Sequence, residues 1–209
     1  MTLDKFRPVA NRLLEPFVDA ADAVGLSPNG VSVLAFGFAV AAGVSFALAG
    51  SATLLTDPIT PLYVVGAFLV LLNGWCDLLD GALARRQGSA SASGDLLDHV
   101  IDRYADIVII AGLAAGVGEY LLGFLAVTGV LMTSYLGTQA QAVGLDRVYG
   151  GLVGRADRLA IIGVVTVVAA FYTPELYGLT LVGWLLVFFA VVGHVTALQR
   201  FYHSMTALE

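Results

Sequence analysis

Six apolar stretches, each about 20 residues long, occupy most of this 209-residue chain. A helix of that length and character crosses the hydrocarbon core of a bilayer. The composition agrees, since 58% of the residues are hydrophobic and only 12% are charged, whereas soluble domains have about 25% charged residues. We therefore predict an all-α integral membrane protein with six transmembrane helices. The predicted spans lie near residues 29–50, 60–84, 95–117, 120–143, 156–173 and 176–199.

The segment before the first span has a different pattern. Residues 1–24 mix apolar and charged positions at helical spacing, which is typical of an amphipathic helix lying in the membrane interface. Pro16 falls inside this segment and disfavours a regular helix, so we expect one bent helix or two short ones. The whole chain, 1–209, is thus predicted to be a single domain, with a juxtamembrane segment over 1–24 and a six-helix bundle over about 29–199.

Two local signals refine this bundle. Ser27 followed by Pro28 predicts a helix start, because serine caps the first turn and proline is tolerated within it. Gly112 and Gly116 form a small-xxx-small pair that allows close helix packing, which we expect within the bundle.

The positively charged residues predict the orientation. With the N-terminus inside, the outer loops 51–59, 118–119 and 174–175 contain no lysine or arginine. The cations lie in or near the inner segments: Lys5, Arg7, Arg12, Arg85, Arg86, Arg103, Arg147, Arg155, Arg158 and Arg200. Because lysine and arginine are enriched in cytoplasmic loops, we predict a multi-pass protein of the cell membrane with both termini in the cytoplasm. The net charge of −6 and the lack of a basic stripe argue against nucleic-acid binding.

Two pairs of aspartates interrupt this apolar chain within 26 residues: Asp77 with Asp80, and Asp98 with Asp102. Carboxylates near hydrocarbon are costly and usually functional. Spacings of three and four residues place each pair on one helical face, so the ends of two adjacent spans could bring all four together near the cytoplasmic side. Oxygen ligands suit Mg²⁺, Mn²⁺ or Ca²⁺, and two such ions could clamp a diphosphate. The alternative is a structural role, in which these acids pair with nearby arginines.

The residues around the aspartates complete a recognisable motif. The pattern Asp77-x2-Asp80-Gly81-x2-Ala84-Arg85-x8-Gly94-x3-Asp98-x3-Asp102 resembles the signature of the CDP-alcohol phosphatidyltransferase family at every position. Ser27-Pro28-Asn29 also resembles the family's entry to its first span. The resemblance implies an enzyme that moves a phosphatidyl group from a CDP-linked lipid to an alcohol and releases CMP.

The same resemblance implies a role for each motif residue. Asp77, Asp80 and Asp98 would bind Mg²⁺ or Mn²⁺, with two ions expected. Asp102 would bind metal and also act as the general base on the acceptor hydroxyl. The CDP moiety would contact the residues Asn29, Gly81, Ala84, Arg85 and Gly94. The family likeness further suggests a homodimer.

The sequence gives less information about the acceptor alcohol. Asp102-Arg103 and the segment Gly151–Leu159 resemble the inositol-phosphate branch, and Arg103, Arg155 and Arg158 could form an anion pocket or serve only as topology anchors. The Lys-x-Arg pair usual in that branch is replaced by Gly137 and Gln139. Inositol phosphate, glycerol phosphate and uncharged or zwitterionic alcohols therefore all remain possible acceptors.

The lipid donor is also open. Lys5 is the sole lysine of an acidic chain, which is typical of a halophilic organism or of a GC-rich genome. In an archaeon the transferred group would be archaetidyl, with ether chains. Two other functions remain as alternatives: a divalent-cation transporter that uses the aspartates, and a non-catalytic relative of the enzymes.

Overall fold

A computed structural model describes residues 7–50, 58–146 and 152–209, with side chains from residue 13 onward. Lys5, Arg147 and Gly151 lie outside the described residues. The described chain is helical apart from one isolated β-bridge between Leu176 and Leu179, which agrees with the predicted all-α class. Its helices are α1 (Arg7–Ala23), α2 (Pro28–Ala49), α3 (Leu62–Arg86), α4 (Ala92–Val117), α5 (Tyr120–Ala142), α6 (Arg155–Ala169) and α7 (Leu181–Leu208).

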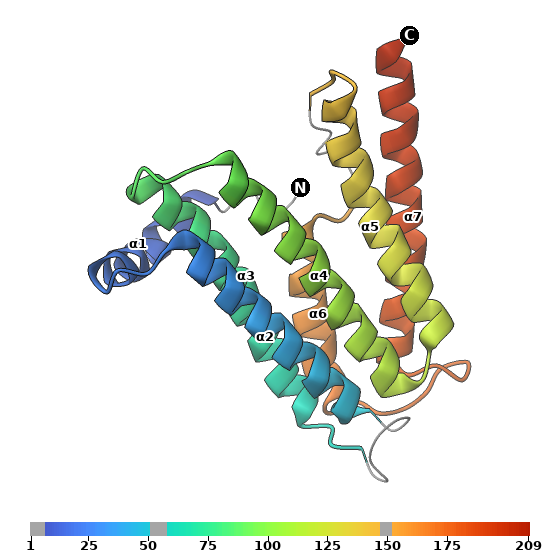
Figure 1. The fold of residues 1–209 in the computed structure, drawn as a ribbon. Coiled ribbons are helices and arrows are strands. Elements are labelled where there is room, and N and C mark those ends of the chain that lie inside the picture. The colour runs from blue at the N-terminus through green and yellow to red at the C-terminus, as the bar shows by residue number, and fades with distance from the viewer. Residues whose placement is uncertain (1–6, 51–57, 147–151) are drawn as a thin grey trace.

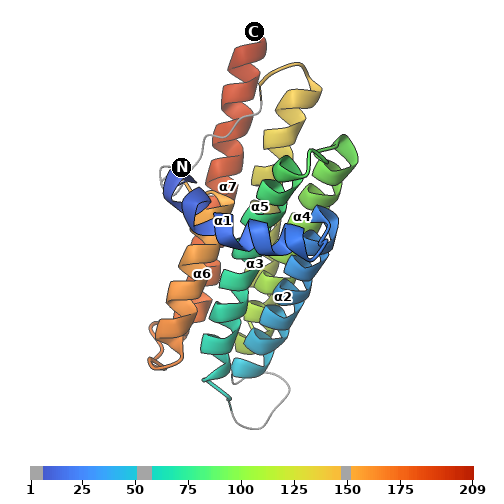
Figure 2. The same ribbon diagram turned by 90° about the vertical axis from the view of Figure 1, so that its left-hand side faces the viewer.

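Helix α1 lies across the other helices rather than alongside them (Figure 2). It continues through Pro16 as one helix, so the option of two short helices was wrong. Leu14, Val18 and Ala21 are buried at helical spacing and pack in one cluster with residues of α2 and α3. This apolar stripe holds α1 against the ends of those two helices.

Two helix starts follow directly from local sequence. Ser27 caps α2, and its hydroxyl accepts a hydrogen bond from the Gly30 N–H at 3.1 Å, as the Ser-Pro pair predicted. Ser91 caps α4 in the same way, accepting from the Gly94 N–H at 3.2 Å. The cap lets α4 begin before the predicted residue 95, because an N-cap hydroxyl satisfies one of the free amides of the first turn.

The last two predicted spans had incorrect boundaries. Helix α6 ends at Ala169, and α7 begins only at Leu181. A turn containing Tyr177 (φ 53°) and Gly178 (φ 77°) interrupts the apolar sequence between them. Thr173-Pro174 indicated a break between the two spans, but the apolar residues beside it made the break look too short, because hydropathy does not distinguish a helical residue from one in an apolar loop.

Four helices, α2, α3, α5 and α7, are long and apolar enough to cross a membrane. Helix α6 has only 15 residues, or about 22 Å at 1.5 Å per residue. Helix α4 is long enough, but Asp102, Arg103 and Asp106 lower the apolar character of its middle. The helix lengths and compositions therefore support a membrane protein directly, with four candidate spans.

Helix α2 is the common support of the two helices that carry the aspartates. Both α3 and α4 pack along it, while α3 also contacts α6, and α5 packs along α7 (Figure 1). Glycines permit the closest approach: a Cβ on Gly112 of α4 would lie 2.2 Å from the Gly43 carbonyl oxygen of α2. A Cβ on Gly116 would lie 2.3 Å from the Phe46 carbonyl oxygen. The small-xxx-small pair thus serves packing within the chain, as predicted.

Gly43 provides a test of this packing. A Cβ at Gly43 would lie 2.6 Å from the Val108 carbonyl oxygen, whereas one at Gly37 of the same helix would meet nothing within 4 Å. We expect Gly43→Ala to lower stability by about 1–3 kcal/mol through overpacking. Gly37→Ala should be neutral or slightly stabilising, because alanine favours a helix more than glycine does. Thermal melting of both variants in detergent checks this, and equal melting temperatures would contradict it.

Candidate active site

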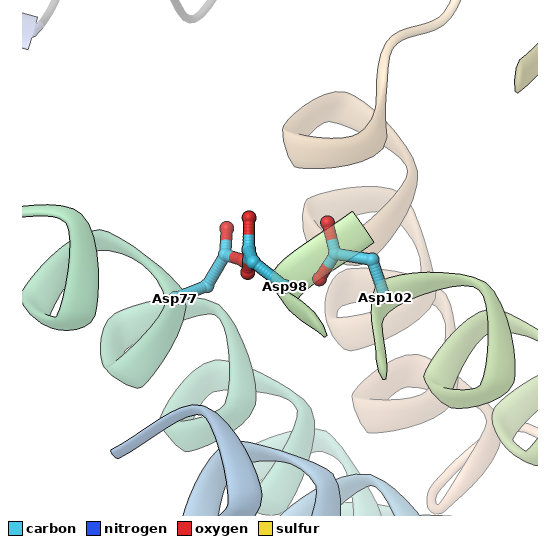
Figure 3. A group of neighbouring side chains, drawn as sticks. All are labelled: Asp77, Asp98 and Asp102. Carbon is cyan, nitrogen blue, oxygen red and sulfur yellow. The ribbon is translucent and has the colours of Figure 1, made fainter. Parts of the chain in front are cut away.

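Three carboxylates from two helices meet at one point. Asp77 of α3 and Asp98 and Asp102 of α4 each place an oxygen within 4.8 Å of the others. Figure 3 shows the three side chains lying side by side between the two helices that carry them. The convergence predicted from the spacing is therefore confirmed for these three residues. Their separation suits ligands that share bound cations, because carboxylate oxygens are the groups that hard divalent ions prefer.

The fourth aspartate, Asp80, lies outside that group of three. Its side chain is buried, and its Oδ2 accepts a hydrogen bond of 2.6 Å from the hydroxyl of Ser32 on α2. Ser32 also donates to the Pro28 carbonyl at 3.2 Å. Ser32 thus orients Asp80 from a neighbouring helix, and nothing about a lone serine in an apolar span indicated this role in the sequence.

A cavity of about 430 Å³ opens beside the aspartates. Asp80 and Asp98 line one part of it. The starts of α2 and α4 line another part, so backbone amides of two first turns lie near the same space. Every residue predicted to bind the CDP moiety also lines this cavity: Asn29, Gly81, Ala84, Arg85 and Gly94.

The glycines of the motif lie on the cavity wall, where a side chain would extend into the cavity or contact its other lining residues. A Cβ on Gly94 would be 3.3 Å from the Ser91 hydroxyl and 3.6 Å from the Asn29 side-chain oxygen. A Cβ on Gly81 would be 3.5 Å from a guanidinium nitrogen of Arg85. Small residues at these positions therefore keep the space between α2, α3 and the start of α4 open.

On another side of the aspartates lies Arg155, the first residue of α6. Its guanidinium donates to Asp77 Oδ2 and to Asp102 Oδ1, both at 2.7 Å. It also lies 3.4 Å from the side-chain oxygen of Asn73. One arginine from a third helix therefore bridges the carboxylates of α3 and α4.

Arg103 continues this arrangement toward α5. Its guanidinium lies 3.5 Å from Asp102 Oδ2 and donates to the hydroxyl of Ser134. On the same turn of α5, the Thr133 carbonyl accepts a hydrogen bond of 2.6 Å from Arg200 of α7. Arg200 is buried, although the sequence analysis treated it only as a topology marker.

Arg158 has a different environment from the other two predicted acceptor residues. It is 5% exposed and donates to Asp106, which is 3% exposed, at 2.5 Å. Asp106 was not among the predicted site residues, although it continues the four-residue spacing of Asp98 and Asp102 along one face of α4. That periodicity was the signal that could have identified it.

The buried arginines keep some of their donors free. The Nε atoms of Arg103, Arg155 and Arg158 are buried and have no hydrogen-bond partner within the described part of the chain. Unpaired buried donors are uncommon and costly. Together these three side chains form a positively charged cluster that could donate further hydrogen bonds to an anion.

Comparison with known proteins identifies this arrangement. A sequence model of the CDP-alcohol phosphatidyltransferase family matches residues 25–196, and the chain belongs to that family. It is 32% identical to the archaetidylinositol phosphate synthase of Methanothermobacter thermautotrophicus, over 99% of this chain and 96% of that protein. The resemblance inferred from the aspartate motif is thereby confirmed.

Solved structures agree in fold. The phosphatidylinositol phosphate synthase of Mycobacterium tuberculosis with CDP-DAG bound superimposes with a TM-score of 0.75 at 27% identity, covering 93% of this chain and 94% of the other. The same enzyme in complex with manganese and citrate also gives a TM-score of 0.75 at 27% identity, covering 92% and 89%.

The Asp106–Arg158 pair is expected to stabilise the fold only as a pair. Asp106→Leu would leave the Arg158 charge buried without its partner, which should cost about 3–5 kcal/mol. Replacing both residues, as in Asp106→Leu with Arg158→Met, should recover much of that loss. Denaturation in detergent measures the free energy of unfolding of the unmodified protein, the single variant and the double variant.

The exposed pair Asp19–Arg86, at 2.8 Å, is the matched control. Asp19→Leu should change stability by no more than about 1 kcal/mol, because water screens exposed ion pairs. A double variant at 106 and 158 that is no more stable than the single variant would contradict the paired role.

Proposed function

We propose that this chain transfers a phosphatidyl or archaetidyl group from a CDP-linked lipid to a polyol phosphate, with inositol phosphate the favoured acceptor, and releases CMP. One observation carries the proposal. The carboxylates of Asp77, Asp98 and Asp102 form one cluster. On one side of this cluster lies the cavity lined by the motif residues, and on the other side lie arginines. This arrangement provides separate places for a donor diphosphate and an anionic acceptor around one set of aspartates.

The residues present fit Mg²⁺ or Mn²⁺. Asp77, Asp98 and Asp102 offer oxygens at ligand-sharing separation, and Asp80 faces the same cavity as Asp98. These four side chains would hold two divalent ions. When bound, such ions neutralise the diphosphate and stabilise the departing CMP. The manganese complex of the solved relative supports this assignment.

The cavity would take the CDP part of the donor. Gly81, Ala84 and Gly94 leave space beside α3 and the start of α4, while Asn29 contributes an amide group from α2. Arg85 is exposed at the cavity, and its planar guanidinium can bind two phosphate or ribose oxygens at once. The relative solved with CDP-DAG supports a CDP-lipid donor here.

Asp102 would accept the proton of the acceptor hydroxyl as that oxygen attacks phosphorus. Of the three clustered aspartates, Asp102 is the one that contacts both Arg103 and Arg155, so a hydroxyl held by these arginines would lie close to it. Arg103, the next residue of α4, lies 3.5 Å from its Oδ2 and would keep the carboxylate in place during the reaction. Such positioning accounts for much of the rate in phosphoryl transfer.

The arginines would select a phosphorylated acceptor. Arg103 and Arg155 border Asp102 and have buried donors without partners among the described residues. Arg158 is buried against Asp106, so it would add positive charge and hold α6 in place rather than enclose the acceptor. The names of the similar enzymes favour inositol phosphate over glycerol phosphate, although Gly137 and Gln139 stand at the positions of the usual cations.

We further propose six spans, α2 to α7, with α1 in the interface and the aspartates near the cytoplasmic face. The predicted outer loops contain no lysine or arginine, which supports this orientation. In α4 the charges of Asp102, Arg103 and Asp106 are used in contacts with other helices, which would let this helix cross the membrane. The protein would reside in the cell membrane and function as a homodimer.

The first test of the reaction removes the base. Asp102→Asn should lower CMP release from CDP-lipid by at least about 100-fold, because general bases contribute 10²- to 10⁴-fold. Glu175→Gln, in the turn at the opposite end of α6 from Arg155, should retain full activity. Release of radiolabelled CMP in detergent with Mn²⁺ measures both. Full activity in Asp102→Asn would contradict the mechanism.

A second test addresses the acceptor. Inositol phosphate, glycerol phosphate, inositol and serine are supplied in parallel with one CDP-linked lipid. We expect inositol phosphate to react with the highest kcat/KM, because its phosphate can bind the arginine cluster. Lipid products separated by chromatography identify the acceptor. A preference for inositol or serine would contradict a role of the arginines in acceptor binding.

A further inference from the structure

Arg155 connects two helices that otherwise meet mainly through a third. Asp77 lies on α3 and Asp102 on α4, and each of these helices packs along α2. Among the described residues, α3 and α4 are not a closely packed pair. Arg155 reaches from α6 to both carboxylates with equal distances of 2.7 Å. It therefore serves as the positive charge that these two acids share.

We propose that Arg155 is an internal counter-cation that competes with divalent metal for Asp77 and Asp102, and that metal binding frees its guanidinium to receive the acceptor anion. This inference rests on the proposed function, since it assigns the metal to these aspartates. It makes metal loading a precondition for a complete acceptor pocket.

The competition follows from charge and distance. The guanidinium binds one oxygen of Asp77 and one of Asp102, and both carboxylates are candidate metal ligands. A metal bound to the same oxygens would have to displace these hydrogen bonds. A metal bound to the other oxygens would still lie within a few ångströms of a like charge in a largely buried place, where repulsion is strong. Metal binding is thus weakened while Arg155 stays on the aspartates.

The guanidinium can leave without moving α6. Arg155 Nε has no hydrogen-bond partner in the described chain, and the contact with Asn73 is long at 3.4 Å. Its two short contacts are those with Asp77 and Asp102, whereas the third nearby carboxylate, Asp106, lies 4.0 Å from Nε. Three residues further on, Arg158 is fixed to Asp106, which anchors the first turn of α6. Loss of the aspartate contacts would accordingly release the side chain and keep the backbone in place.

A released guanidinium favours an anion. Charge-assisted hydrogen bonds to phosphate would replace those lost from the carboxylates. Because coupling between two binding sites is reciprocal, an anion that holds Arg155 away from the aspartates must also strengthen metal binding. The structure thus predicts positive cooperativity between a divalent metal and a tetrahedral anion.

Metal affinity measured without CDP-lipid tests the competition. Free Mn²⁺ is followed by electron paramagnetic resonance as it is titrated into purified protein in detergent. Arg155→Gln should bind Mn²⁺ about tenfold more tightly than the original chain, because the competing cation is gone. Arg86→Gln removes the same charge at an exposed pair with Asp19, and it should bind Mn²⁺ within about twofold of the original chain.

Sulfate serves as the anion in a second arm, with chloride at equal ionic strength as the reference. Sulfate should tighten Mn²⁺ binding to the original chain by about fivefold or more, within the usual range of coupling between sites. It should have no such effect on Arg155→Gln. An equal sulfate effect in both proteins would overturn the coupling.

Other outcomes separate this inference from the proposed function. Equal or weaker Mn²⁺ binding by folded Arg155→Gln overturns the inference, while the proposed function stands if Asp102→Asn is inactive. Failure of the original chain to bind Mn²⁺ overturns the metal site itself. If Arg155→Gln does not elute as folded protein, Arg155→Met replaces it. Methionine removes the charge and keeps an unbranched side chain, so equal or weaker Mn²⁺ binding by this variant would overturn the inference.

Discussion

Compensation of buried negative charge is the constraint on which this structure depends. Asp77, Asp98, Asp102 and Asp106 lie among apolar helices, where an unpaired carboxylate is very costly. Arg155 and Arg158 of α6 supply most of the compensating contacts. The contacts with the aspartates therefore fix the position of α6. For compensating the negative charge, the placement of its first turn is more important than the length of the helix.

Close packing on α2 sets the distance between the two halves of the site. Gly43 and Gly112 let the backbones of α2 and α4 approach, while α3 packs along another side of α2. Ser32 of α2 then orients Asp80 of α3. Small residues in the apolar part of the bundle thus determine where carboxylates at its end can meet, because packed helices transmit their spacing along their length.

The aspartates divide the site into two chemically different sides. The cavity side combines small residues and the first turns of two helices, which suits a bulky diphosphate with a nucleotide. The other side presents Arg103 and Arg155, which suits a compact anion. Family membership and the solved relatives agree with transfer of a lipid phosphate between two such sides. Arg155 would link the two events, since it contacts two of the carboxylates proposed to bind the metal.

The sequence by itself determined the all-helical class, the family and several of the residues that line the cavity beside the aspartates. Apolar length, the cap formed by Ser27 and the spacing of the aspartates are local features that act over a few turns. Contacts between distant segments were decided only by tertiary structure. Ser32 with Asp80, Arg158 with Asp106, and the bridge formed by Arg155 each join different helices. Such partners depend on how helices pack and rotate, which periodicity along one chain does not specify.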